Sequence, residues 1–213
     1  MPAPYTQAPV STRVQWAVVL AALLLVWHSL ADHPLLPPDE GRYGSVSAFM
    51  AENGNWLTPQ LRDQVHVTKP PLTYWAQAAG TLLFGRTELA VRLPSALGAT
   101  LVVLTLFWFA RRMWGPLVAV LAVGAYAVMP LPAIVGRLGT TDSLLNAWWW
   151  LALCTGCVVL WEGGSAQERT EAVDRSGAPQ RTGATQRAGA NSHRALVVVF
   201  WAAIALVGLT KGP

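Results

Sequence analysis

Charged residues are scarce in this chain: Asp, Glu, Lys and Arg together make up 12% of its 213 positions. A soluble globular domain carries about 25% charged residues. Hydrophobic residues account for 53% of the sequence and stand in long runs, not in the periodic patterns of half-buried strands or surface helices. The shortage of charge therefore argues against an ordinary soluble domain. It predicts an all-α integral membrane protein.

Cysteine is equally scarce, with only Cys154 and Cys157 in the whole chain. Their C-x-x-C spacing is also found in metal and redox sites, but here it lies inside the apolar stretch "WWWLALCTGCVVLW" without another Cys or a nearby His. Such residues more often serve as small apolar side chains of a buried helix. We therefore predict no metal site at this pair.

The basic residues do not form a cluster, although the net charge is +4 and the pI is near 9.5. Most of the Arg residues outside one polar segment stand at the ends of apolar runs. This pattern is typical of the positive-inside orientation of membrane helices, not of a phosphate-binding face. We expect the lipid bilayer as a partner and no nucleic acid.

Several apolar runs have about the length that a membrane-spanning helix needs, which is about 20 residues. The first is 14–30, and 93–161 holds three more. A fifth, 195–213, is cut short where the sequence stops. The segment 162–194 has almost no large apolar residue, so we predict a disordered polar loop there. The runs within 93–161 are Leu93–Ala110, Leu117–Val135 and Leu144–Trp161.

The predicted topology depends on whether the run Pro70–Gly85 spans the membrane. This run is short and contains Gln77. If it lies at the membrane surface, then Arg13, Arg111 with Arg112 and the loop 162–194 all fall on one side. The positive-inside rule makes that side the cytoplasm, together with the N-terminus 1–13. Segment 31–92 is then an outer loop with juxtamembrane helices. One alternative stays open, since Ser29-Leu30-Ala31 is similar to a signal-peptidase site.

On this topology the polar residues that need most explanation emerge on the outer side. Asp39 follows two prolines and begins a stretch whose Tyr43 and Met50 share one helical face with Val46 and Phe49. Each polar residue also has a simple structural interpretation. Asp39 or Asp142 would then cap a helix, a role worth about 1 kcal/mol. The outer residues are Asp39, Glu40, Arg42, Lys69, Asp142 and Lys211, with Arg137 nearby as a headgroup anchor.

The order of the motifs adds information that each motif lacks alone. The chain reads "PPDEGRYG", "NGNWLTPQL", "VTKPPLTYW", "FGRTELAVRLPSALGA", "RRMWG", "RLGTTDSLL" and "LTKGP". In this order it resembles the polyprenyl-phosphate-sugar-dependent glycosyltransferases. It is most similar to the aminoarabinose transferase-like branch of the protein mannosyltransferase superfamily. The resemblance covers Trp16 to Pro213 apart from 162–194, and it implies a GT-C-like multi-span helical bundle.

The resemblance also implies roles for individual residues. The catalytic acid of the first outer loop falls on Asp39, with Glu40 beside it, and the acid of the second loop falls on Asp142, near Arg137. The donor phosphate would be bound by Arg42, Tyr43, Lys69 and Lys211. The implied partners are a polyprenyl-phosphate-linked sugar and a glycolipid, glycan or protein acceptor. The implied location is the periplasmic or extracellular face of the inner (plasma) membrane.

Two departures from the family pattern affect these expectations. Close family members carry Glu directly before Lys-Pro-Pro, where it can help to hold a metal, but Thr68 stands here. No cofactor is therefore predicted with certainty, and a divalent metal stays open. Family members also continue for several more spans, so we expect this chain to be a portion of a longer enzyme. A transporter-like or non-catalytic membrane protein is the alternative.

Overall fold

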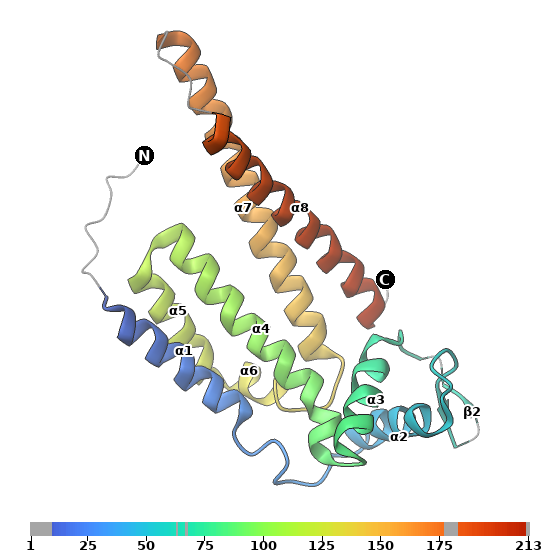
Figure 1. Cartoon of the computed structure of the whole chain (residues 1–213). Helices are drawn as coiled ribbons and strands as arrows, with labels where there is room; N and C mark the ends of the chain where they lie inside the picture. The colour runs from blue at the N-terminus through green and yellow to red at the C-terminus, as the bar shows by residue number, and fades with distance from the viewer. Residues whose placement is uncertain (1–9, 63, 67, 177–182, 212–213) are drawn as a thin grey trace.

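The computed structural model describes residues 10–62, 64–66, 68–176 and 183–211. Within these ranges the chain forms helices joined by short connections and a single two-stranded hairpin, β1 (Gln60–Leu61) with β2 (Gln64–Val65). Figure 1 shows long helices packed side by side, with α2, α3 and the hairpin gathered at one end of the bundle. The all-α prediction is confirmed. The helices are α1 (Thr12–Trp27), α2 (Asp39–Asn53), α3 (Leu72–Phe84), α4 (Glu88–Trp114), α5 (Pro116–Val128), α6 (Pro130–Val135), α7 (Asp142–Ser176) and α8 (Gly183–Lys211).

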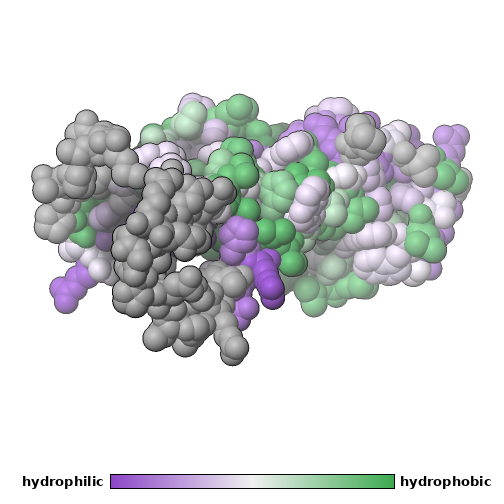
Figure 2. All heavy atoms as spheres, turned by 90° about the horizontal axis from the view of Figure 1, so that it is seen from above, coloured by the Kyte–Doolittle hydropathy of each residue, from purple (hydrophilic) through white to green (hydrophobic). Residues whose placement is uncertain are grey.

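Three helical segments are long and apolar enough to cross a membrane, namely Glu88–Trp114, Asp142–Gly164 and Asn191–Lys211. The helices α1 and α5 are apolar but shorter. Apolar side chains cover much of the outer surface seen in Figure 2. Such a surface favours lipid over water as its surroundings, as in a multi-pass membrane protein. Examples of the exposed apolar side chains are Leu20, Leu24, Leu104, Leu121, Leu160, Val198 and Trp201.

The run Leu117–Val135, predicted as one continuous helix, is broken at Met129. The backbone of Met129 is extended, with φ −71° and ψ 129°, and α6 starts anew at Pro130. Proline disfavours helical backbone in the residue before it and has no N–H to continue the ladder. The break turns the chain at the same end of the bundle as α2 and α3 (Figure 1).

The polar segment 162–194 also differs from the expectation of a disordered loop. In the structure α7 continues to Ser176 and α8 begins at Gly183, while residues 177–182 lie outside the described ranges. The absence of large apolar residues prevents a core, but it does not prevent a helix. Ala, Gln, Glu and Arg are all good helix formers, and here they extend helices that the apolar runs have already started.

Helices α2 and α3 pack against each other and present a small apolar core. Tyr43, Val46 and Met50 on α2 meet Tyr74 and Ala78 on α3, and all five are buried. The predicted helical face is thereby confirmed for these α2 residues. Helix α3 has 13 residues, which corresponds to a length of about 20 Å. It therefore packs along α2 and the start of α4 as a short helix.

Glycine allows α3 and α4 to approach closely. A Cβ atom placed on Gly80 would lie 2.7 Å from the backbone oxygen of Ala90, which a real side chain does not tolerate. Gly41 on α2 offers a contrast, because nothing lies within 4 Å of its Cβ position.

We expect Gly80→Ala to lower the free energy of unfolding by about 1–3 kcal/mol, since the added methyl group forces α3 away from α4. Thermal unfolding in detergent would measure this loss. Gly41→Ala is the control and should be neutral or slightly stabilising, because alanine favours the helical state. Equal melting temperatures for wild type and Gly80→Ala would contradict the packing described here.

Candidate active site

A buried ion pair joins α2 to α4. Arg92, in the second turn of α4, directs its planar guanidinium at the carboxylate of Glu40, with Nε–Oε1 and Nη2–Oε2 distances of 2.9 and 2.8 Å. The two side chains are only 5% and 2% exposed. Two parallel hydrogen bonds of this kind give both strength and a fixed orientation.

Two backbone N–H groups also donate hydrogen bonds to the Glu40 carboxylate. The N–H of Leu36 donates to Oε2 at 2.8 Å, and the N–H of Gly139 donates to Oε1 at 2.6 Å. Burial by itself would raise the pKa of Glu40, but the hydrogen bonds from Arg92, Leu36 and Gly139 outweigh it and lower the pKa. The Glu40 carboxylate is therefore buried, hydrogen-bonded through both oxygens and ionised.

Arg92 also binds the loop between α1 and α2. Its Nη1 donates to the carbonyls of Leu30 and His33, both at 2.8 Å, and its Nη2 donates to the carbonyl of Pro34 at 2.9 Å. With these contacts every side of the Glu40–Arg92 pair is enclosed by protein. The structure buries Glu40, and the catalytic role that the resemblance implies for it beside Asp39 stays a prediction.

Gly139 is held from two sides. Its N–H donates to Glu40, and its carbonyl accepts a 3.0 Å hydrogen bond from Nε2 of Gln77 on α3. The same Gln77 nitrogen reaches the carbonyl of Val91, and its oxygen accepts from Ser47. A Cβ at Gly139 would lie 2.5 Å from Val91, so only glycine fits there. The connection between α6 and α7 is thereby fastened to α2, α3 and α4.

Asp39 and Arg42 lie one helical turn apart at the start of α2 and form a partly exposed ion pair. The Arg42 guanidinium stacks over the ring of Tyr43, with 5.3 Å between its Cζ and the ring centroid. Tyr43 in turn packs against Tyr74 at a centroid distance of 5.7 Å. Burial raises the pKa of Tyr74, against an opposing effect of the Thr68 hydroxyl, so this phenol stays neutral.

Asp142 and Lys211 bring together the start of α7 and the end of α8. Lys211 Nζ lies 2.7 Å from Asp142 Oδ1, and both side chains are exposed. The start of α2, the start of α7 and the end of α8 lie at the same end of the bundle (Figure 1).

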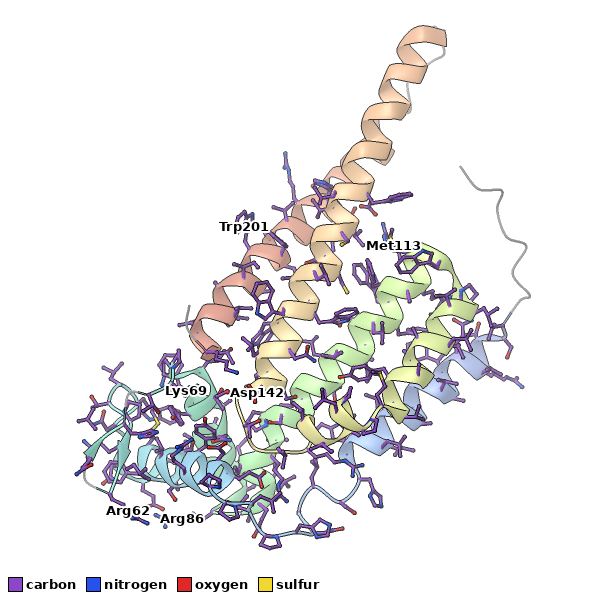
Figure 3. All side chains as sticks on the ribbon, turned by 180° about the vertical axis from the view of Figure 1, so that it is seen from behind. Arg62, Lys69, Arg86, Met113, Asp142 and Trp201 are labelled. Atoms are coloured by element: carbon purple, nitrogen blue, oxygen red, sulfur yellow. The ribbon has the colours of Figure 1, made fainter. Side chains whose placement is uncertain are left out.

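Lys69 lies in the loop that leads into α3, and α3 contacts α8, the helix that ends at Lys211. Figure 3 shows Lys69 in the same region as Asp142. Lys69 is half-buried and makes no ion pair with any residue in the described part of the chain.

Arg137 is not brought into this group, although it is close to Asp142 in sequence. Its guanidinium donates to the carbonyl of Leu25 in the last turn of α1. A cation at a helix C-terminus satisfies free carbonyls and complements the helix dipole. Arg137 therefore ties the second loop to α1.

The residues around Thr68 do not form a metal site. The Thr68 hydroxyl is hydrogen-bonded to His66 Nε2 at 2.9 Å. Among the residues that the structure describes, no three His, Cys, Asp or Glu side chains gather closely enough to hold a metal ion. The donor set present does not fit a divalent cation, and we derive no chemical step through one.

An apolar cavity of about 580 Å³ lies between α4, α5, α6 and α7 and reaches Asp142 at one end. Such a volume suits a hydrocarbon chain, with polar groups at one end to fix its orientation. Its lining includes Val102, Leu106, Tyr126, Val135, Asn146 and Trp150.

The sequence analysis missed three residues that shape this region: Arg92, Gln77 as a buried link, and Tyr74. Arg92 carried a usable signal, because an Arg inside the apolar stretch "LAVRLPSALGA" needs a buried carboxylate partner. Nothing in the sequence indicated that Glu40 would be that partner, 52 residues away.

Comparisons with known proteins agree with this architecture. The family model described as dolichyl-phosphate-mannose-protein mannosyltransferase matches residues 68–164. An undecaprenyl phosphate-alpha-4-amino-4-deoxy-L-arabinose arabinosyl transferase from Aeromonas hydrophila is 31% identical over 71% of this chain and 28% of its own length. The enzyme of the same name from Edwardsiella ictaluri is 34% identical over 64% of this chain and 25% of its own length.

A solved structure also matches this chain. The crystal structure of ArnT from Cupriavidus metallidurans bound to undecaprenyl phosphate matches with a TM-score of 0.75 and 27% identity, over 95% of this chain and 33% of that one. The chain thus spans between a quarter and a third of the length of these relatives.

Fold and sequence together indicate the class: the chain has the fold of the GT-C glycosyltransferases and is similar to them in sequence. Within this class it matches a part of the aminoarabinose transferase-like members.

The closed Glu40–Arg92 pair predicts a pH-dependent stability. Glu40→Gln leaves Arg92 as an uncompensated buried charge, so we expect a loss of about 3–5 kcal/mol near neutral pH. Because the folded-state pKa of Glu40 is lowered, its stabilisation is complete above the ordinary Glu pKa and disappears as the pH falls through the lowered value. Denaturant unfolding in detergent at several pH values should show the two proteins converging at acidic pH.

The matched control is Glu52→Gln on the same helix, whose partner Arg86 forms an exposed ion pair. It should change stability little at any pH. A Glu40→Gln protein that differs from wild type equally at neutral and acidic pH would contradict the role of the ionised carboxylate.

Proposed function

We propose that this chain carries the donor-binding region and the base of a membrane glycosyltransferase. The reaction moves a sugar from a polyprenyl-phosphate donor to a glycolipid acceptor on the periplasmic face of the inner membrane. One observation carries the proposal. Two acids and three cations from distant parts of the chain lie at the same end of the bundle, and one of the acids, Asp142, lines an apolar cavity (Figure 1). They are Asp39, Asp142, Arg42, Lys69 and Lys211.

The chemistry needs a base and a site for negative charge. The acceptor oxygen forms a bond to the anomeric carbon of the sugar as the bond from that carbon to the phosphate oxygen breaks. The acceptor proton passes to Asp39, and the bonding electrons leave with the phosphate. The phosphate gains negative charge during this step, so Lys69, Lys211 and Arg42 stabilise the transition state more than the bound donor.

The partly exposed ion pairs allow the donor phosphate to bind to the cations. Arg42 is paired with Asp39, and Lys211 with Asp142, in partly exposed positions. Exposed pairs of this kind contribute only about 0–1 kcal/mol, so an incoming phosphate competes for the cations at low cost. In this way donor binding releases the Asp39 carboxylate for the acceptor.

The transporter alternative calls for charges that line a path through the membrane. Arg92 in the second turn of α4 lines no such path, because its guanidinium is buried and bound by Glu40 and by loop carbonyls. This arrangement favours an enzyme with its chemistry at one end of the bundle.

The first test is sugar transfer. Membranes that contain the natural gene product would be given a radiolabelled polyprenyl-phosphate sugar and a glycolipid acceptor. Asp39→Asn should lower transfer by about 100-fold or more while donor binding persists, because the amide cannot accept the proton. Transfer at the wild-type rate by Asp39→Asn would refute the assignment of the base.

The second test concerns the donor phosphate. Lys69→Met keeps most of the length of the side chain but removes its charge, so we expect the donor KM to rise about 10- to 100-fold, since a charged hydrogen bond is worth about 1.5–3 kcal/mol. Arg62→Met is the control, because Arg62 lies on the hairpin, away from Asp142 (Figure 3). An unchanged donor KM for Lys69→Met, or equal changes in both variants, would exclude Lys69 as a phosphate ligand.

A further inference from the structure

The Glu40–Arg92 pair lies between the two halves of the candidate site. Asp39 is the direct neighbour of Glu40 in the first turn of α2, and Arg42 lies one turn after Asp39. Asp142 begins α7 three residues after Gly139, whose N–H is bound by Glu40 at 2.6 Å. A single carboxylate thus contacts both the helix that carries one acid and the loop that leads to the other.

We propose that Glu40 is a positioning residue which, through Arg92 and the Gly139 N–H, sets the separation between the Asp39–Arg42 and Asp142–Lys211 groups. The inference rests on the function proposed above. It gives Glu40 no contact with substrate, in keeping with its 1% exposure.

The geometry explains why a carboxylate is required at this position. Oε1 accepts from Arg92 Nε and from the Gly139 N–H, while Oε2 accepts from Arg92 Nη2 and from the Leu36 N–H. An amide of the same shape has one acceptor oxygen and one NH₂ donor. Whichever way it turns, two of the four N–H groups face another donor.

Two of the three cations of the donor site do not depend on this carboxylate in the same way. Lys69 precedes α3, and Lys211 ends α8, so neither lies on a segment that Glu40 contacts. Loss of the Glu40 contacts displaces Asp39, and with it Arg42 on the same helix, but leaves Lys69 and Lys211 in place. The expected result is a fall in kcat with a smaller change in donor KM.

The experiment combines a distance measurement with kinetics. Nitroxide labels on cysteines at the exposed positions Ser45 and Asn146, with Cys154 and Cys157 replaced by alanine, report the separation of α2 and the start of α7 by pulsed electron resonance. Wild type should give one narrow distance distribution. Glu40→Gln should broaden or shift it and lower kcat by about 10- to 100-fold, with the donor KM changed by less than about threefold.

Glu52→Gln, on the same helix, should match wild type in both measurements. If Glu40→Gln does not fold, Glu40→Asp takes its place. It keeps the charge beside Arg92, but it is one methylene too short to reach both Arg92 and Gly139, and it should broaden the distribution less. An unchanged distribution in the folded variant, or a broadened one with the wild-type kcat, overturns the proposal.

The distance measurement and the kinetics test this inference and the proposed function separately. If the wild-type protein transfers no sugar from any donor tried, the proposed function fails. The label distances still show whether Glu40 sets the separation of α2 and α7. If wild type is active and only the distance arm fails, the positioning role alone is refuted.

Discussion

The rest of the structure depends on one buried carboxylate–guanidinium pair. Glu40 and Arg92 have lost almost all contact with water, a costly arrangement unless each polar atom finds a partner. They find them in five backbone groups, at Leu30, His33, Pro34, Leu36 and Gly139. The same contacts that compensate the buried charges also determine where α2 and the second outer loop lie on α4.

The structure contains two kinds of ion pair, which differ in burial. The Glu40–Arg92 pair is enclosed and directional, which suits a fixed part of the framework. The pairs Asp39–Arg42 and Asp142–Lys211 are partly open to solvent and weak. Weak pairs can exchange partners without disturbing the helices that carry them. The framework therefore stays rigid while the charges that would meet a phosphate remain available.

The sequence predicted the helical membrane architecture because long apolar runs have few other solutions. The predicted topology also brings Asp39, Lys69, Asp142 and Lys211 to the same side of the membrane. The structure pairs Asp142 with Lys211, and the common site stays a prediction. The sequence did not predict that Glu40 and Arg92 are partners. Their contact spans 52 residues and leaves no local pattern, and Glu40 next to Asp39 resembles a second site acid until its burial is known. The helical continuation of 162–176 was missed for the opposite reason, because propensity outweighed the lack of a core.

The sequence separations within this network bear on how the protein is made. Glu40 binds Arg92, 52 residues later, and Gly139, 99 residues later. During synthesis the first outer loop leaves the ribosome long before either partner exists. Its α1–α2 connection cannot reach its final form until α4 and the turn after α6 are in place. The first loop is thus synthesised early but completed late, because Arg92 on α4 and then Gly139 after α6 must both be in place before Glu40 has all its partners.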